Sequence, residues 1–127
     1  MDTREQLRAE AERIQAFLEI TVSDDPHEQV ARLSDMSVYM ARTGRMLAEA
    51  SCLRDRAVAA VYAGEGRAIL KMPATVARKF VDSQTADENE LVIWIDRLNR
   101  SCTHCAENLR TQISFAKQQL ELTRKGY

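Results

Sequence analysis

The sequence is poor in residues that interrupt helices, with four glycines and two prolines in 127 residues. Aromatic residues make up only 6% of the chain, whereas Ala, Leu, Arg, Glu and Gln, which favour helices, are common. Apolar residues account for 45%, which suffices for a hydrophobic core in one domain of this length. We therefore predict a single all-α domain over residues 1–127.

The chain also lacks an excess of either charge, because its formal net charge is −1. A near-neutral protein has no overall field that attracts it to nucleic acid or to a membrane surface. No apolar run approaches the roughly 20 residues of a membrane-spanning helix, and the charged start MDTREQLRAEAERIQ is unlike a signal peptide. Three cysteines, an odd number without a disulfide pattern, fit a reducing compartment. We expect a cytoplasmic protein that binds no membrane.

Familiar catalytic motifs are missing as well. The sequence contains no Gly-rich phosphate loop, no HExxH and no GxSxG. Long helices also offer few clefts in which two carboxylates could share a catalytic centre. We therefore expect no enzymatic activity and no cofactor.

Apolar residues at helical spacing predict two helices in the first part of the chain. The first covers about residues 3–22. The second starts at Pro26, after the N-cap residue Asp25, and runs to about Met72. Gly64 and Gly66 could kink or end it. Its apolar stripe comprises Leu33, Met36, Met40, Leu47, Val58 and Val61.

Two further helices are predicted after Pro73. The segment PATVARKFV forms a short helix anchored by Val76, Phe80 and Val81. Thr85 and Glu88 show a capping-box pattern at the start of a last helix over residues 86–124. Its stripe comprises Leu91, Ile95, Leu98, Cys102, Cys105, Leu109, Ile113, Ala116 and Leu120. Helices this long in a small chain predict an elongated antiparallel bundle of three main helices plus a short connecting helix.

The charges are unevenly distributed. Residues 1–28 carry three basic and eight acidic residues, a net of −5, whereas residues 29–81 carry nine and four, a net of +5. On the second helix a basic stripe falls within an arc of about 80° and extends roughly 45 Å; it comprises Arg42, Arg45, Arg56, Arg67 and Lys71. The stripe could contact phosphates, but no aromatic residues are interleaved for base stacking. We favour docking of the acidic first helix onto it.

The segment SCTHC raises the question of a metal or redox site. Cys102 and Cys105 fall inside the apolar stripe of the last helix, whereas His104 points about 200° away from Cys102. Zinc needs four tetrahedral ligands, and the chain offers no second cysteine pair. We interpret the two cysteines as apolar core residues. A metal or disulfide site completed by another subunit, or a redox pair, remains an alternative.

Several residues indicate contacts beyond the chain's own core. Arg54 falls in the apolar stripe of the second helix, where a charge must be paired or must reach the edge. Ile93, Phe115 and Leu122 form a second apolar line on the last helix that passes His104. A helix with two apolar lines contacts two neighbours, so we predict a homo-oligomer, most simply a dimer.

Part of the last helix resembles small helical proteins that bacteriophages, prophages and other mobile elements encode. The resemblance covers about a third of the chain and is carried by Trp94-Ile95-Asp96-Arg97-Leu98-Asn99-Arg100, Cys102-Thr103-His104 and Leu109-Arg110-Thr111-Gln112-Ile113-Ser114, and less clearly by MARTGRMLAEA. It implies a setting near recombination or single-strand DNA-handling genes, without implying an activity. In these proteins glutamine is common where this chain has Cys105.

These observations favour a non-enzymatic accessory or assembly protein of a phage-like element that acts through helix-mediated protein contacts. One alternative is an accessory factor in recombination or single-strand DNA handling that binds nucleic acid through the basic stripe. The other is a protein with an intersubunit metal or thiol site.

Overall fold

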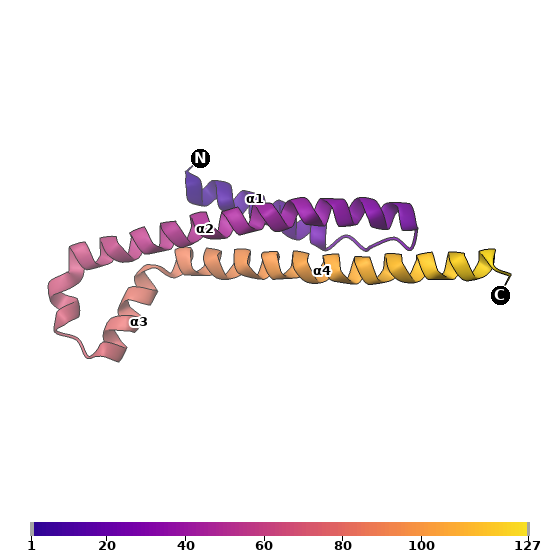
Figure 1. The fold of residues 1–127 in the computed structure, drawn as a ribbon. Coiled ribbons are helices and arrows are strands. Elements are labelled where there is room, and N and C mark those ends of the chain that lie inside the picture. The colour runs from indigo at the N-terminus through magenta and orange to yellow at the C-terminus, as the bar shows by residue number, and fades with distance from the viewer. Residues whose placement is uncertain (1, 127) are drawn as a thin grey trace.

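A computed structural model describes residues 2–126, which form four helices joined by short connections (Figure 1). In order they are α1 (Thr3–Leu18), α2 (Pro26–Leu70), α3 (Ala74–Gln84) and α4 (Ala86–Arg124). The described range contains no strand, and the predicted all-α class is confirmed. Within this range no helix combines the length and the apolar character needed to cross a membrane.

The first two helices begin with carboxylate caps. The Asp2 carboxylate accepts a hydrogen bond from the Glu5 backbone N–H at 2.8 Å, and Glu5 returns the contact by accepting from the Asp2 N–H at 3.2 Å. This capping box was not predicted. The predicted cap of α2 is confirmed, because Asp25 accepts from the His27 N–H at 3.1 Å and Pro26 occupies the first turn.

Helix α1 ends at Leu18, so the prediction that it extends to residue 22 is wrong. Ile20 and Val22 are exposed rather than buried. The segment after Leu18 is rich in β-branched and turn-forming residues, which favour extended backbone. The Ile20 carbonyl accepts a hydrogen bond from Arg32 Nη2 at 3.1 Å, and the Arg32 guanidinium lies 4.1 Å from the centre of the Phe17 ring. Arg32 thereby holds the connection to α2 in place.

Helix α2 continues through both of its late glycines. It has 45 residues, which corresponds to about 68 Å at 1.5 Å per residue. Gly64 and Gly66 do not end it, although Figure 1 shows its last turns bending toward α3. A methyl group built at either glycine would meet no atom within 4 Å, so no close approach requires glycine there.

The corner between α3 and α4 differs from the expectation in two respects. Thr85 does not cap α4: its buried hydroxyl donates to the Val81 carbonyl at 3.0 Å and accepts from Asn89 Nδ2 at 3.1 Å. The capping-box prediction for Thr85 and Glu88 is therefore wrong, because the hydroxyl is used to close the end of α3. Val76, a predicted anchor, is exposed, while Val81 is buried and Phe80 is half-buried.

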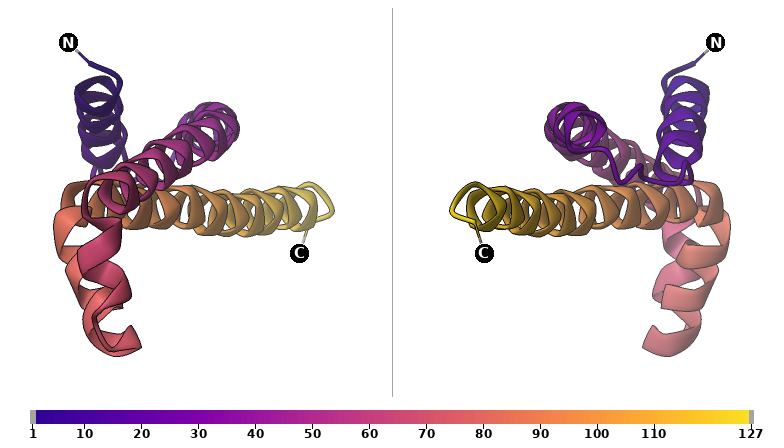
Figure 2. Two further views of the ribbon diagram at one scale, coloured as in Figure 1. Left: turned by 90° about the vertical axis from the view of Figure 1, so that its left-hand side faces the viewer. Right: turned by 90° about the vertical axis from the view of Figure 1, so that its right-hand side faces the viewer.

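Helices α2 and α4 lie side by side and antiparallel along most of their length, and α1 crosses the pair at an angle (Figure 2). The core is formed by one face of each of the three helices α1, α2 and α4. It comprises Leu7, Ala11, Ile14, Met36, Met46, Ala50, Leu91, Ile95, Leu98, Cys102, Ala106 and Leu109. Leu33, Met40 and Leu47 of the predicted stripe pack against this core while half-buried. Helix α3 returns beneath the end of α2, where Ile69 is buried.

Candidate interaction surfaces

A buried polar contact joins α2 and α4 near the middle of their interface. Asn99 Nδ2 donates to Thr43 Oγ1 at 2.9 Å and to the Met40 carbonyl at 3.1 Å. Thr43 is fully buried and donates in turn to the Tyr39 carbonyl at 2.7 Å. Asn99 Nδ2 and Thr43 Oγ1 are both hydrogen-bonded, so the contact is compatible with the surrounding apolar core.

A second polar contact lies toward the start of α2, where Gln29 Nε2 donates to Gln112 Oε1 at 3.0 Å. From Gln29 to Thr43 is 14 residues along α2, and from Gln112 back to Asn99 is 13 residues along α4. The two contacts therefore belong to one antiparallel register. Each pair has one buried member, Gln29 or Thr43. Such pairs fix the register of paired helices, since a shift along the axis would leave the buried polar group unsatisfied.

The basic stripe of α2 is divided by its contacts. Arg42 pairs with Glu10 of α1, and Arg45 Nε contacts Glu49 Oε1 on its own helix at 3.1 Å. Arg56, Arg67 and Lys71 are exposed and have no ion-pair partner among residues 2–126. Only the first part of the stripe is thus neutralised by local acids.

Helix α1 does not dock on the basic stripe as a block of negative charge. Its single acidic contact with α2 is the Glu10–Arg42 pair within the described residues. Its basic residues instead pair with the acidic start of α4: Arg4 contacts Glu88 at 3.1 Å, and Arg8 contacts Glu90 at 3.5 Å. Apolar packing of Leu7, Ala11 and Ile14, rather than charge segregation, positions α1.

Four exposed basic residues, which sequence reasoning did not group, lie on the two helices that meet at the α2–α3 corner. Arg78 and Lys79 on α3 are exposed, like Arg67 and Lys71 at the end of α2. None of the four has an ion-pair partner in the described part of the chain. The short loop that joins α2 and α3 brings these residues to one end of the molecule (Figure 1).

The three cysteines differ in their exposure. Cys102 is 0% exposed in the α2–α4 core, and burial, aided by the neighbouring Cys105, raises the pKa of its thiol. Cys105 was predicted to lie in the apolar stripe but is half-buried, and the neighbouring Ala106 is buried instead. His104 is exposed, 3.8 Å from Glu107. No group of three His, Cys, Asp or Glu residues suited to hold a metal occurs among the residues the structure describes.

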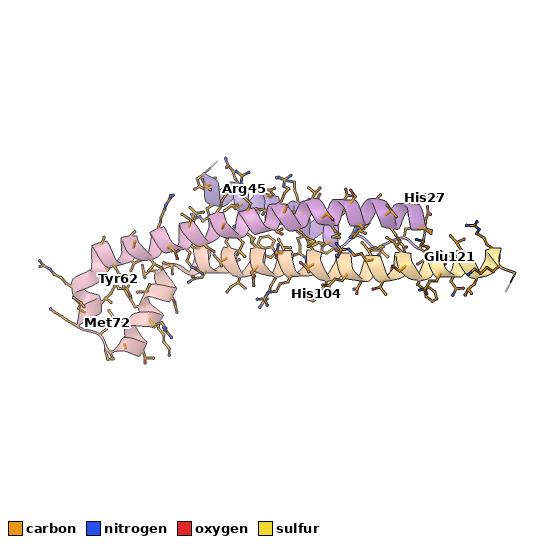
Figure 3. All side chains as sticks on the ribbon, viewed as in Figure 1. His27, Arg45, Tyr62, Met72, His104 and Glu121 are labelled. Atoms are coloured by element: carbon orange, nitrogen blue, oxygen red, sulfur yellow. The ribbon has the colours of Figure 1, made fainter. Side chains whose placement is uncertain are left out.

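The second apolar line of α4 faces solvent. Ile93 is 53% exposed, Phe115 61% and Leu122 46%, and His104 lies on the same outer face (Figure 3). Ile93 also lines a shallow groove of about 520 Å³ beside Trp94. Arg54, predicted to be paired or to reach an edge, is partly exposed, and its guanidinium contacts Asp55 at 3.5 Å.

The end of α4 extends past the start of α2. Because Gln29 lies opposite Gln112, the partner helix α2 begins near residue 115 of α4, and later residues have no helix beside them. We call residues 114–124 the free end of α4. The predicted apolar stripe continues into it, but Leu120 is 63% exposed. His27 and Glu121 mark the two helices at this end in Figure 3.

No family model, no curated protein and no solved structure matches this chain.

Proposed function

We propose that the protein is a non-enzymatic accessory or assembly protein that acts through helix-mediated contacts with other protein chains. The observation that carries this proposal is the second apolar line of α4, formed by Ile93, Phe115 and Leu122, which no helix of its own chain covers. Large apolar residues gathered on one helix face, in addition to a buried face, are typical of contact surfaces. The resemblance of residues 94–114 to proteins of mobile elements supports a role in such an element, in the cytoplasm.

The proposal predicts that wild-type protein self-associates or binds a partner through this line. Replacing Phe115 and Leu122 together with lysine should abolish association, because both residues are exposed and each lysine would carry a charge into the contact. Val38→Lys is a matched control, since Val38 is an exposed valine on α2 away from this line. Size-exclusion chromatography with light scattering, together with circular dichroism, measures both association and helix content. Association unaffected by the double change would contradict the proposal.

The α2–α3 corner supports a second candidate function, binding of nucleic acid. Arg56, Arg67 and Lys71 have no ion-pair partner among the described residues, and α3 adds Arg78 and Lys79 at the same end. Five phosphate contacts give a slope of log affinity against log salt of roughly −3.5 to −4.5. Fluorescence anisotropy with a labelled oligonucleotide at two salt concentrations tests this function. Tight, salt-sensitive binding that is lost in an Arg67→Glu, Lys71→Glu variant would place it first.

A further inference from the structure

The free end of α4 joins three features at one end of the molecule. The first is apolar: Ala116 and Leu120 continue the stripe that α2 covers over the rest of the helix, so the α2–α4 interface continues into solvent. At 1.5 Å per residue, the eleven residues 114–124 provide about 16 Å of helix with this stripe. A helix that lies where α2 would continue could cover it.

The second feature is positive charge on the free end itself. Lys117 and Arg124 lie within about 70° of the centre of the apolar stripe, on the same side of it. Neither has an ion-pair partner among residues 2–126. The free end therefore presents an apolar strip with two cations along one border.

The third feature is an acidic patch at the start of α2, directly beside the free end. Asp24, Asp25 and Glu28 are all exposed, and residues 19–28 contain no Lys or Arg. The nearest cation along the chain is Arg32, whose guanidinium is engaged with the Ile20 carbonyl and the Phe17 ring. Between this patch and α4 lies an open groove of about 440 Å³, lined by Asp24, Gln29, Thr111, Gln112, Phe115 and Ala116.

We propose that the free end of α4 pairs, antiparallel and about a two-fold axis near Leu120, with the free end of a second copy of this chain. In this arrangement the partner's α4 lies against the exposed stripe and ends near the start of α2. Its cation Arg124, which lies opposite residue 116, then approaches Asp24 and Glu28, and the same contact forms in the opposite direction. Lys117 lies opposite residue 123, about 10 Å farther along the axis. A surface that carries both an acidic and a basic part at one end is self-complementary, as a two-fold interface requires.

The partner's helix also ends in a favourable direction. The carboxyl end of a helix carries partial negative charge, and the amino end of α2 carries partial positive charge. A partner helix that stops at Pro26 would bring these ends together along one line. The overlap is short compared with the area of about 1,200–2,000 Å² in stable interfaces, so we expect a reversible dimer rather than an obligate one.

Disulfide trapping tests the two-fold arrangement. This inference goes beyond the proposed function, because the stripe of Ala116 and Leu120 lies on the face of α4 opposite to Ile93, Phe115 and Leu122. In a Cys52→Ser background, which removes the exposed native thiol, Leu120→Cys should form a covalent dimer under mild oxidation. Ser101→Cys, exposed on the same helix but about 28 Å away along the axis, should not. Failure of Leu120→Cys to cross-link, or cross-linking of Ser101→Cys to the same extent, would overturn the arrangement.

Charge reversal gives an independent test that does not depend on Leu120. The pair Asp24→Lys, Glu28→Lys should weaken dimerisation at least tenfold, and Arg124→Glu should weaken it as well, whereas Lys117→Glu is a matched control that should have little effect. Combining Asp24→Lys, Glu28→Lys and Arg124→Glu in one chain should restore dimerisation, because the reversed charges again face each other across the two-fold axis. Asp25 is left unchanged since it caps α2. Self-association that none of these variants alters would overturn this inference, and so would a wild-type chain that never self-associates. Both results leave the proposed function standing, because its partner can be a different protein and its contact is tested by the Phe115 and Leu122 changes.

Discussion

Removing the amide of Asn99 should destabilise the α2–α4 pair, because this half-buried side chain donates two hydrogen bonds across the interface. In Asn99→Ala, two hydrogen bonds are lost, one to Thr43 Oγ1 and one to the Met40 carbonyl. At about 0.5–1.5 kcal/mol each, the loss amounts to about 1–3 kcal/mol of the free energy of unfolding. For a chain of this size that lowers Tm by about 3 to 18 °C.

The matched control for this change is Asn108→Ala. Asn108 is exposed on the same helix and has no hydrogen bond among the described residues, so this change alters helix propensity alone. Subtracting the control from Asn99→Ala isolates the contribution of the polar contact. Urea denaturation followed by circular dichroism measures both values.

A double-mutant cycle with Thr43→Val makes the test specific to the interhelical bond. Valine keeps the shape of threonine and removes the hydroxyl that Asn99 contacts. We expect a coupling free energy of about 1 kcal/mol between the two positions. If Asn99→Ala matches Asn108→Ala within about 0.3 kcal/mol, or if the coupling is below that value, the contact does not stabilise the pair.

Three further outcomes are expected. Gly64→Ala and Gly66→Ala should each raise the free energy of unfolding by about 0.5–1 kcal/mol in thermal melts, because helix α2 continues through both positions and a methyl group meets no atom there; a loss of stability would show that the bent end needs glycine. With a thiol-specific reagent near neutral pH, Cys52 should react quickly and Cys102 only after unfolding, because Cys102 is buried; a fast second thiol at Cys102 would contradict the packing. The pKa of the Cys102 thiol is raised, so the folded state holds the thiol proton more tightly than the unfolded state does. The stability that this proton contributes should be present below the ordinary thiol pKa of about 8.5 and be lost as pH rises through the folded pKa. Urea denaturation of the wild type and of Cys102→Ala at several pH values measures this loss of stability.

The helices themselves could be predicted from the sequence because few residues interrupt them. Apolar periodicity located α2 and α4 and the start of α2 at Asp25–Pro26. The end of α1 was misplaced because Val22 continues the apolar spacing of Leu18, although it lies in the connection to α2. Periodicity identifies which residues could share a face and does not show where the partner surface ends.

The buried polar residues at the α2–α4 interface were not predicted, for a related reason. Thr43 and Gln29 are buried, yet hydropathy counts them as surface residues. Their burial depends on Asn99 and Gln112, which lie far away in the sequence and become neighbours only when α2 and α4 pair. Such contacts can be recognised once the register is known.

The candidate surfaces were predicted in part. Ile93, Phe115 and Leu122 were expected to face away from the main stripe, and all three are exposed. Leu120 was assigned to the buried stripe, because sequence spacing alone does not reveal that α2 starts too late to cover it. The charge segregation was read as an attraction between α1 and α2, whereas one ion pair joins them and α1 instead pairs with α4.

The central claim is that the free end of α4 serves association rather than folding. The most direct test is sedimentation equilibrium of two chains, the wild type and a chain truncated after Ser114. The wild type should show a mass that rises with concentration from 14.4 kDa toward twice that value. The truncated chain should keep its helical core, since every residue of that core precedes the cut, and should remain a monomer. A wild type that stays monomeric, or a truncated chain that associates as strongly as the wild type, would contradict the account.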